Sequence, residues 1–460
     1  MASEYPTSYF SLPLLTIIPS FLISLLFPLY SISLLHVSFP CASASTIKQG
    51  QEALSFLTWK SSLDIQSQSF LSSWSGSNPC YHWFGVTCNN PVGTISHLNL
   101  SSCGLRGTLY NLDFSSLPDL LYLNLQKNSF YKTIPSNITY LSKLTFLSLS
   151  INALSGDIPY GIGMLRSLEE LFLSYNVFVR LIPQSIGNLT KLITLCFDTN
   201  NLSGPIPQEI GFLRSLNSLD LSIKNLEGPI PPSIGNLRNL TSLFLYENNL
   251  SGSIPQEIGL LRSLNDLVLS INKFSGHIPS FIGNLRNLTS LFLNDNKFSS
   301  SIPQEIGLLR SLNCFDLSIN NLEGPIPPSI GNLRNLTCLY LYKSNLSGSI
   351  PQEIGLLRSL NDLVLSINNL SGPIPPSIGN LMNLTHLSLH HNKLSGSIPL
   401  EMDNLIHLKS LQLGENNFTG HLPQQICLSG GLENFTALVN NFTGPIPTSL
   451  RICTSLVSRT

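Results

Sequence analysis

Three histidines lie close together in the sequence, and their spacing suggests a first candidate for chemistry. His386 and His390 fall on the same side of an expected short strand, and His391 lies beside them. Imidazole is a common metal ligand and also titrates near neutral pH. The polar groups expected on neighbouring strands are few, namely Asp362, Ser410 and Gln412. We therefore predict solvated side chains that are available for a pH-sensitive contact, with no metal site and no cofactor.

Aromatic and acidic side chains recur at the outward positions of the expected strands. Aromatic rings supply a large contact area at a low entropic cost, and carboxylates favour a ligand with basic groups. The predicted ligand-binding residues are Phe172, Phe244, Tyr246, Asp266, Phe292, Asp316, Tyr340, Tyr342, Asp362, His386 and His390. In contrast, every arginine from Arg214 to Arg358 lies in a G-[FLN]-L-R segment outside the strand.

The sequence contains no motif that is typical of an enzyme. Its glycines never form G-x-G-x-x-G or G-x-x-x-x-G-K-[ST], so no phosphate-binding loop is indicated. H-E-x-x-H and G-x-S-x-G are also absent. The charged fraction is 11% and the net charge is −1, which indicates no nucleic-acid partner and no membrane-surface patch. We predict a binding protein that is not an enzyme.

The elements that position these residues follow from a 24-residue period. Proline follows an aliphatic residue at position 135 and at every twenty-fourth position up to 447, in fourteen unbroken copies. Such a period is typical of a solenoid, in which each repeat buries its apolar face only against its neighbours. A solenoid offers one long surface, which favours binding over catalysis.

Residues 237–260 (LRNLTSLFLYENNLSGSIPQEIGL) show how one repeat is expected to fold. Leu243 and Leu245 point inward, while Phe244 and Tyr246 point outward from a short strand. The strands of successive repeats stack in parallel about 4.8 Å apart, and their outward residues form one concave face. Glycine and proline interrupt the return segment. The predicted fold class is an α/β repeat solenoid with a parallel sheet on the concave face and irregular or 3-10 return segments.

An asparagine follows the strand in twelve of fourteen repeats, from Asn128 to Asn440. A buried amide both donates to and accepts from backbone groups of adjacent turns, where an unpaired group costs about 1–3 kcal/mol. We therefore predict a structural asparagine ladder. Lys224 and Ser344 interrupt it. Ser344 is expected to substitute in part, whereas Lys224 has no acceptor and is expected to loosen its turn.

Residues 1–44 are predicted to be a signal peptide. Residues 10–39 are apolar and almost uncharged, and Ala42, Ser43 and Ala44 form a small-residue motif that predicts cleavage after Ala44. The segment is long, contains prolines and lacks a basic start, so a retained membrane anchor is the alternative. Beyond it we predict a cap over residues 45–91, about fifteen repeats over 92–447 and the start of another over 448–460.

The cap and the cysteines indicate an oxidising compartment. Leu54, Leu57 and Leu63 form an apolar stripe that predicts an amphipathic helix over residues 52–63. Two disulfides are predicted, Cys80 with Cys88 and Cys427 with Cys453. Cys314 and Cys338 lie on adjacent expected strands, where we expect side chains to be somewhat too far apart to bridge, so free thiols are predicted.

These features together resemble the ectodomain of plant leucine-rich-repeat receptor kinases. The cap motif NPCYHWFGVTC, the repeat body LxxLxxLxLSxNxLSGxIPxxIGNL and the order of signal, cap and repeats carry the resemblance from about residue 45 onward. It implies a twisted, right-handed, glycosylated superhelix that binds a small ligand, often a secreted peptide, on its inner surface. A leucine-rich-repeat co-receptor and a cytoplasmic kinase normally complete the signal. The R-x-R pair that some relatives are thought to use on a peptide carboxylate is absent.

The chain departs from the family pattern at Thr460, where no paired-cysteine cap, membrane helix or kinase motif has appeared. We interpret it as the ligand-binding region of a C-terminally truncated receptor kinase or receptor-like protein. The resemblance implies the plasma membrane for a full-length receptor and otherwise secretion. Two alternatives remain: a secreted interaction protein, such as an inhibitor of cell-wall-degrading enzymes, or a non-functional receptor fragment.

The sequence also contains N-x-[ST] sequons, which a secreted chain presents to the glycosylation machinery. Two of them, Asn99 and Asn434, fall on expected strands and are the weakest candidates. The predicted glycosylation sites are Asn137, Asn188, Asn201, Asn239, Asn249, Asn287, Asn335, Asn345, Asn369, Asn383, Asn417 and Asn441.

Overall fold

The computed structural model describes residues 41–89, 93–427, 430–451 and 453–459. The chain divides into two units, Met1–Ser43 and Ala44–Thr460, so the predicted signal peptide lies almost entirely outside the described residues. Helix α1 (Cys41–Ser62) begins at the predicted cleavage motif and continues into the predicted cap. Within the described ranges, no helix combines the length and the hydropathy that a membrane span requires.

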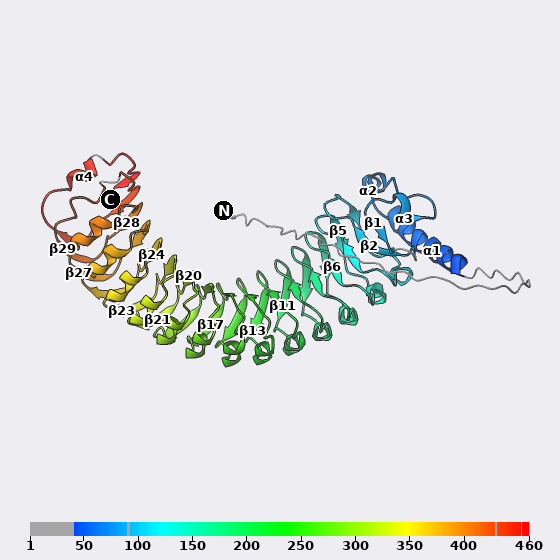
Figure 1. The fold of residues 1–460 in the computed structure, drawn as a ribbon, viewed down its shortest axis with the longest axis horizontal. Coiled ribbons are helices and arrows are strands. Elements are labelled where there is room, and N and C mark those ends of the chain that lie inside the picture. Colours follow the sequence, from blue (N-terminus) through cyan, green and yellow to red (C-terminus); the bar gives the residue numbers. More distant parts are fainter. Residues whose placement is uncertain (1–40, 90–92, 428–429, 452, 460) are drawn as a thin grey trace, which may run out of the picture. The chain divides into compact units, whose positions relative to one another are not determined.

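Residues 44–460 form a solenoid in which two sheets run through the stacked repeats (Figure 1). The first sheet has 17 strands, and it lines the concave side of this unit. Strand β1 pairs antiparallel with β2, and each later strand pairs in parallel with the strand of the next repeat. Its members are β1 (Val86–Cys88), β2 (Ile95–Asn99), β4 (Tyr122–Asn124), β6 (Phe146–Ser148), β8 (Glu170–Phe172), β10 (Thr194–Cys196), β12 (Ser218–Asp220), β14 (Ser242–Phe244), β16 (Asp266–Val268), β18 (Ser290–Phe292), β20 (Cys314–Asp316), β22 (Cys338–Tyr340), β24 (Asp362–Val364), β26 (His386–Ser388), β28 (Ser410–Gln412), β30 (Asn434–Thr436) and β32 (Ser458–Arg459).

The second sheet has 15 short strands and is formed by the return segments. The sequence analysis expected only irregular or 3-10 structure there, so it missed this sheet. Its members are β3 (Arg106–Gly107), β5 (Ser129–Lys132), β7 (Ala153–Gly156), β9 (Val177–Arg180), β11 (Asn201–Gly204), β13 (Asn225–Gly228), β15 (Asn249–Gly252), β17 (Lys273–His277), β19 (Lys297–Ser300), β21 (Asn321–Gly324), β23 (Asn345–Gly348), β25 (Asn369–Gly372), β27 (Lys393–Ser397), β29 (Asn417–Gly420) and β31 (Asn441–Phe442).

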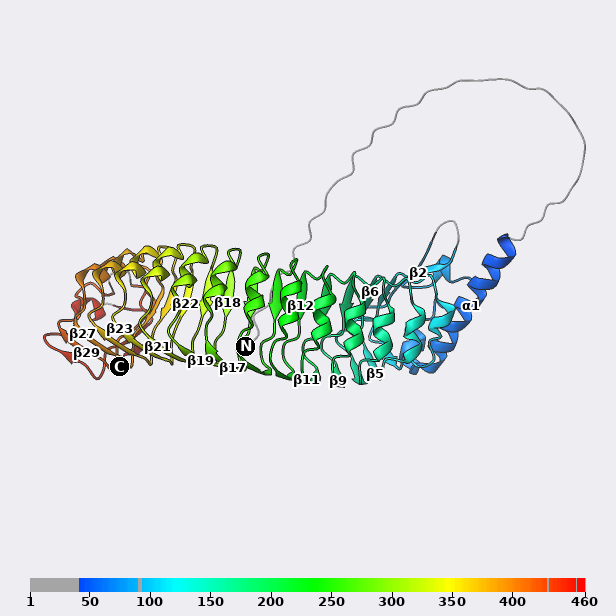
Figure 2. The same cartoon turned by 90° about the horizontal axis from the view of Figure 1, so that it is seen from below.

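Short 3-10 turns complete most repeats and follow one another along the solenoid (Figure 2). Most begin directly after the proline of the repeat, as after Pro207 with φ −66°. A glycine inside the turn lets the next turn approach, since a Cβ at Gly211 would lie 2.4 Å from the carbonyl oxygen of Ser233. The turns are η1 (Phe114–Ser116), η2 (Ser136–Tyr140), η3 (Tyr160–Met164), η4 (Gln184–Asn188), η5 (Gln208–Phe212), η6 (Pro232–Asn236), η7 (Gln256–Leu260), η8 (Ser280–Asn284), η9 (Gln304–Leu308), η10 (Pro328–Asn332), η11 (Gln352–Leu356), η12 (Pro376–Asn380) and η13 (Leu400–Asn404).

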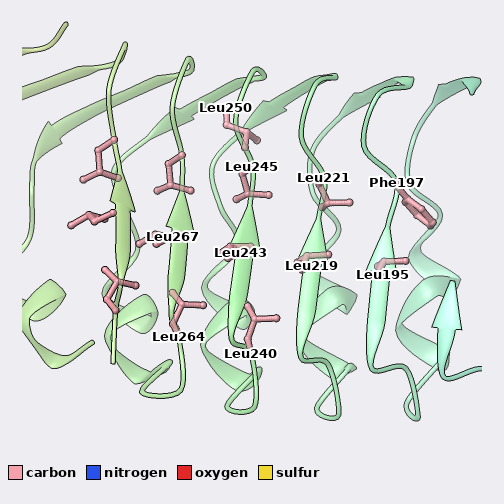
Figure 3. Packing of buried hydrophobic residues seen from close by; sticks show 14 of the residues in the cluster. Leu195, Phe197, Leu219, Leu221, Leu240, Leu243, Leu245, Leu250, Leu264 and Leu267 are labelled. Carbon is pink, nitrogen blue, oxygen red and sulfur yellow. The ribbon is translucent and has the colours of Figure 1, made fainter. Parts of the chain in front are cut away.

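The core is a stack of aliphatic side chains between the two sheets and the 3-10 turns. Leu240, Leu243, Leu245 and Leu250 of one repeat all point inward and are fully buried (Figure 3). The same layer recurs in the next repeat with Leu264 and its equivalents. Burying a leucine side chain contributes about 1.5–3 kcal/mol. The predicted inward positions are therefore confirmed.

The asparagine ladder is also confirmed. The Asn248 amide nitrogen donates to the carbonyl oxygens of Leu221, Leu245 and Tyr246 at 2.9, 3.1 and 3.2 Å. Its amide oxygen accepts from the Leu226 backbone N–H at 3.1 Å. Each asparagine thus joins its own turn to the preceding one, which satisfies buried backbone groups that would otherwise cost stability.

The two interruptions of the ladder differ in the links that they keep to the preceding turn. The ammonium group of the buried Lys224 donates to the carbonyl oxygen of Phe197, so it keeps one link to the preceding turn. The hydroxyl oxygen of Ser344 is buried and has no hydrogen-bond partner among the described residues. The expectation that Ser344 substitutes in part is wrong, because its side chain is too short to reach the preceding turn.

The N-terminal cap contains two short helices beyond α1 that the sequence analysis did not predict, α2 (Ile65–Phe70) and α3 (Pro79–His82). Helix α1 buries Ala53, Phe56 and Trp59, whereas Leu54 is 65% exposed. The predicted stripe was therefore wrong at Leu54, because aromatic residues one turn apart fill the interface. A short helix α4 (Thr448–Arg451) lies near the other end of the chain.

Candidate functional site

Three positions in each repeat face outward from the first sheet: the first and third residues of the strand, and the residue two positions after the strand. In the repeat of β14 these are Ser242, Phe244 and Tyr246, all partly exposed. All eleven predicted ligand-binding residues occupy such positions and are at least partly exposed. Asp266, Asp362 and His386 are at the first position, Phe172, Phe244, Phe292, Asp316 and Tyr340 at the third, and Tyr246, Tyr342 and His390 beyond the strand.

Five of these residues meet in one hollow of about 510 Å³ that extends over β22, β24, β26 and β28. They are Tyr340, Tyr342, Asp362, His386 and His390. The other residues that line the hollow are Val364, Ser366, Ile367, Leu387, Ser388, Ser410 and Gln412. The remaining predicted residues, Phe172, Phe244, Tyr246, Asp266, Phe292 and Asp316, do not line it. The hollow therefore gathers aromatic, acidic and imidazole groups at one end of the predicted surface.

Asp362 is the charged centre of this hollow. One of its carboxylate oxygens lies 2.6 Å from Nδ1 of His386, on the neighbouring strand. Burial raises the pKa of the Tyr340 phenol to about 12, and the nearby carboxylates of Asp362 and Asp316 add to this rise. The Tyr340 hydroxyl therefore stays protonated and remains a hydrogen-bond donor. The hollow presents a carboxylate and a phenol that suit a cationic or polar ligand group.

Asp316 extends the acidic character to β20. The Ser318 backbone N–H and hydroxyl both donate to one of its oxygens, at 2.8 and 2.5 Å. Burial nevertheless raises the pKa of this carboxyl group, and these hydrogen bonds only partly offset the effect. Asp316 pairs in register with Tyr340 on the neighbouring strand. A basic ligand group would therefore meet the poorly solvated carboxyl group of Asp316 next to Tyr340.

The expectation of free thiols at Cys314 and Cys338 is wrong. These cysteines form a disulfide between β20 and β22, and their Cα atoms are 4.8 Å apart. Disulfides span Cα separations from about 4.4 to 6.8 Å, so directly paired strands are not too far apart. Cys80 with Cys88 and Cys427 with Cys453, the two pairs expected from the sequence, are also disulfide-bonded. Cys103 and Cys196 are free.

A second cluster, around β10 and β12, escaped the sequence analysis. Burial lowers the pKa of Lys224 to about 7, although Asp198 and Asp220 oppose this shift. Burial raises the pKa of the Cys196 thiol to about 12, and both carboxylates contribute. Cys196 and Asp220 are paired in register. The break in the asparagine ladder at position 224 was the available signal, but only the fold shows that the lysine is buried near these groups.

A row of neighbouring aromatic rings was also missed. His97, Tyr122, Phe146 and Phe172 follow one another across the first repeats, with ring centroids 5.6, 4.2 and 5.6 Å apart. Only Phe172 was predicted. The spacing of these four residues, close to 24, was visible in the sequence. The row was missed because it begins before the first proline of the 24-residue series, Pro135. The row adds an aromatic surface at the N-terminal end of the first sheet.

The three neighbouring histidines engage separate partners. His386 approaches Asp362, His390 Nδ1 lies 2.9 Å from the Ser388 hydroxyl, and His391 Nδ1 lies 2.7 Å from Glu415. No group of three or more potential metal-binding side chains occurs among the residues that the structure describes. The arrangement offers single polar contacts along the sheet.

The predicted glycosylation sites fall into two main groups. One group lies at or just after the 3-10 turns and is exposed: Asn188, Asn239, Asn287, Asn335 and Asn383. The other group begins strands of the second sheet and is at least partly exposed: Asn201, Asn249, Asn345, Asn369, Asn417 and Asn441. Asn137 differs, because its amide oxygen is buried without a hydrogen-bond partner among the described residues. The exposed positions leave room for a glycan, whereas Asn137 offers less.

Family models match three kinds of segment in this chain. A leucine-rich repeat region matches residues 271–372, and a leucine rich repeat N-terminal domain matches residues 50–89. Single leucine rich repeats match residues 167–189, 239–261 and 383–405. The matches thus cover both the cap and the repeats of the solenoid.

Similar proteins include plant receptors. The leucine-rich repeat receptor-like serine/threonine-protein kinase RGI4 of Arabidopsis thaliana is 37% identical over 132 residues, which is 28% of this chain and 11% of that protein. A crystal structure of PEPR1-AtPEP1 aligns with a TM-score of 0.84 and 37% identity, over 88% of this chain and 57% of that one. The Arabidopsis receptor kinase HAESA ectodomain, in complex with an IDA peptide hormone ligand, aligns with a TM-score of 0.56 and 30% identity, over 89% and 80%. The chain therefore matches only a small part of the curated relative and little over half of the first structure.

Proposed function

The chain belongs to the leucine-rich-repeat proteins, and from that premise we propose that it is the extracellular ligand-binding region of a plant receptor kinase or receptor-like protein. The ligand is a small secreted peptide that carries basic groups, and it lies along the first sheet. A leucine-rich-repeat co-receptor is the expected second partner. The described region acts by binding, at the cell surface or in the extracellular space. Support comes from the similar ectodomain of the receptor kinase HAESA, whose structure contains an IDA peptide hormone ligand.

The observation that carries the proposal is the hollow over β22 to β28. It places two phenols, a carboxylate and two imidazoles beside the apolar surface of Val364 and Ile367. A peptide segment there covers its apolar parts with Tyr340 and Tyr342 and directs a lysine or arginine side chain to Asp362. Aromatic anchors and desolvated charges of this kind dominate the affinity of recognition surfaces.

The test is peptide binding by a variant with both Asp266→Asn and Asp362→Asn. The probes are synthetic peptides of identical length that differ only in their content of lysine and arginine, and isothermal titration calorimetry measures the affinity. We expect the double variant to bind the most basic peptides about tenfold more weakly, because each lost carboxylate removes a charge-assisted contact. Neutral peptides should show little change.

The matched control is the double variant Glu227→Gln and Glu323→Gln. It removes the same charge from exposed positions of β13 and β21 in the second sheet. The control should bind as the unchanged protein does. If the affinity for basic peptides is the same in both variants and in the parent, the acidic binding surface is rejected.

A further inference from the structure

A row of arginines, one in each of seven successive repeats, lies outside the surface proposed to bind the peptide. Each arginine comes two residues after a 3-10 turn and four residues before a strand of the first sheet. They therefore occupy the loops that lead into the strands, which Figure 3 shows below Leu240 and Leu264. All are exposed. We call this row the arginine ridge: Arg214, Arg238, Arg262, Arg286, Arg310, Arg334 and Arg358.

The ridge is held in register by hydrogen bonds between successive loops. The Asn239 side-chain amide donates to the carbonyl oxygen of Arg214 at 3.2 Å, and Asn287 donates to that of Arg262 at 3.0 Å. Asn335 bonds Arg310 in the same way at 3.1 Å. The loops therefore follow the spacing of the strands they enter, which is about 4.8 Å in a parallel sheet. The ridge presents positive charge at a short and regular interval.

The charge of the ridge is not neutralised locally. The seven loops read FLRSLN, NLRNLT or LLRSLN, so arginine is the only charged residue in each. None of the seven forms an ion pair within the part of the chain that the structure describes. Like charges about 5 Å apart repel each other even in water. The net charge of −1 thus conceals a basic edge beside an acidic sheet, and an anionic ligand relieves the repulsion along that edge.

We propose that the arginine ridge binds a linear acidic polysaccharide whose sugar units carry carboxylates. Guanidinium groups bind carboxylates through two parallel hydrogen bonds, so a regular row of them suits a polymer with a regular row of carboxylates. The residue three positions after each arginine is alternately asparagine and threonine, as at Asn217, Thr241 and Asn265. The Thr241 hydroxyl donates to the side-chain oxygen of Asn217 at 2.7 Å, so the threonines orient the asparagines beside the ridge. The exposed asparagine amide N–H groups provide hydrogen-bond donors for sugar hydroxyl groups.

Two other polyanions, a nucleic acid and an anionic membrane, would also be attracted to arginine. Neither accounts for the parallel row of amide and hydroxyl groups that accompanies the charge. The same repeats contain N-x-[ST] sequons and the Cys314–Cys338 disulfide, which are features of extracellular proteins. The observations therefore favour a polysaccharide of the extracellular space.

The experiment measures binding of the full chain to polygalacturonate, with a neutral glucan of similar length as a reference. The variant carries Arg262→Gln, Arg286→Gln and Arg310→Gln at the centre of the ridge. The control carries Lys273→Gln, Lys297→Gln and Lys393→Gln, which removes the same charge from exposed positions of the second sheet. Each protein is measured before and after enzymatic removal of N-glycans, because Asn239, Asn287 and Asn335 lie directly beside arginines of the ridge.

We expect the parent and the lysine control to bind polygalacturonate equally, and the arginine variant to bind about tenfold more weakly at moderate salt. Melting curves should be the same for all three proteins, because the exchanged side chains are exposed. Equal losses in the two variants would indicate general charge attraction and overturn the proposal. It is also overturned if the neutral glucan, duplex DNA or vesicles of anionic lipid bind as tightly as polygalacturonate, or if no binding occurs with or without glycans.

Discussion

Residues 228–272 and 324–368 are two nearly identical stretches of the solenoid whose surfaces differ. They differ at four positions: Ser242 and Cys338, Phe244 and Tyr340, Glu247 and Lys343, and Asn248 and Ser344. All four fall within a strand of the first sheet or the corner that follows it. The leucines and isoleucines that fill the interior are the same in both stretches and are buried in both.

The four differences have different physical consequences. Cys338 adds a covalent link to Cys314, and Ser344 removes the asparagine that joins neighbouring turns at Asn248. Both changes affect the link between the turns of β20 and β22, so the disulfide joins the same two turns that Ser344 fails to join. Tyr340 places a phenol in the hollow. Phe244, at the matching position of the other stretch, has an apolar ring and does not line the hollow. The comparison shows a constant core that supports a variable surface.

The largest expected effect tests whether the two cores are equivalent. Leu243→Ala and Leu339→Ala each remove a fully buried side chain at the same position of the repeat. We expect each variant to lose about 2–5 kcal/mol of unfolding free energy, because a cavity adds to the lost burial. Denaturant unfolding followed by circular dichroism measures both. Losses that differ by several kcal/mol would show that the two cores are not interchangeable.

An intermediate effect is expected from the disulfide, which only the second stretch has. Cys338→Ser opens a link between residues 24 positions apart in sequence, which costs about 3 kcal/mol on the chain-entropy estimate. Ser242→Ala at the matched position should change the unfolding free energy by only about 0.5 kcal/mol. The same unfolding assay under non-reducing conditions checks both values. Stability of Cys338→Ser equal to that of the parent would mean that the link adds nothing.

The smallest expected effect concerns the asparagine ladder, and it has opposite signs in the two stretches. Asn248→Ser should lower the unfolding free energy by about 1–3 kcal/mol, because backbone groups of Leu221 and Leu226 lose their partner. Ser344→Asn should raise it, by restoring that partner to the preceding turn. Thermal melting of both variants decides the matter. A loss of stability in Ser344→Asn would contradict the interpretation of this column.

Much of the fold followed from the period alone. The inward leucines, the 3-10 returns and the asparagine ladder recur at fixed positions, so one repeat predicted the others. The second sheet did not follow, because segments such as Asn249–Gly252 are short and read as turns. The Cys314–Cys338 link was misjudged because the expected strand spacing of about 4.8 Å already lies within the range of Cα separations that a disulfide spans.

The candidate site was predictable by position but not by grouping. Alternation along each strand identified which side chains face outward, and all eleven predicted residues do so. It did not indicate that Tyr340, Asp362 and His386 share a hollow while Phe172 and Phe244 lie elsewhere. That grouping depends on which neighbouring side chains are large and which are small across four adjacent strands. Nor did it show that Lys224 is buried near Asp198 and Asp220, since the path of a long side chain is set by packing.

The asparagine ladder also determines how this molecule responds to force. Each amide links adjacent repeats, so a pull along the solenoid axis passes through every one of these links in turn. Between Asn128 and Asn440, two repeats lack this asparagine: the one with Lys224, which retains a single hydrogen bond to Phe197, and the one with Ser344. The repeat with Ser344 is also joined to the preceding repeat by the Cys314–Cys338 disulfide, so this link becomes weak only after the disulfide is reduced. Between Asn128 and Asn440, the solenoid therefore has one weakly linked pair of repeats when the Cys314–Cys338 disulfide is formed, and two such pairs when it is reduced.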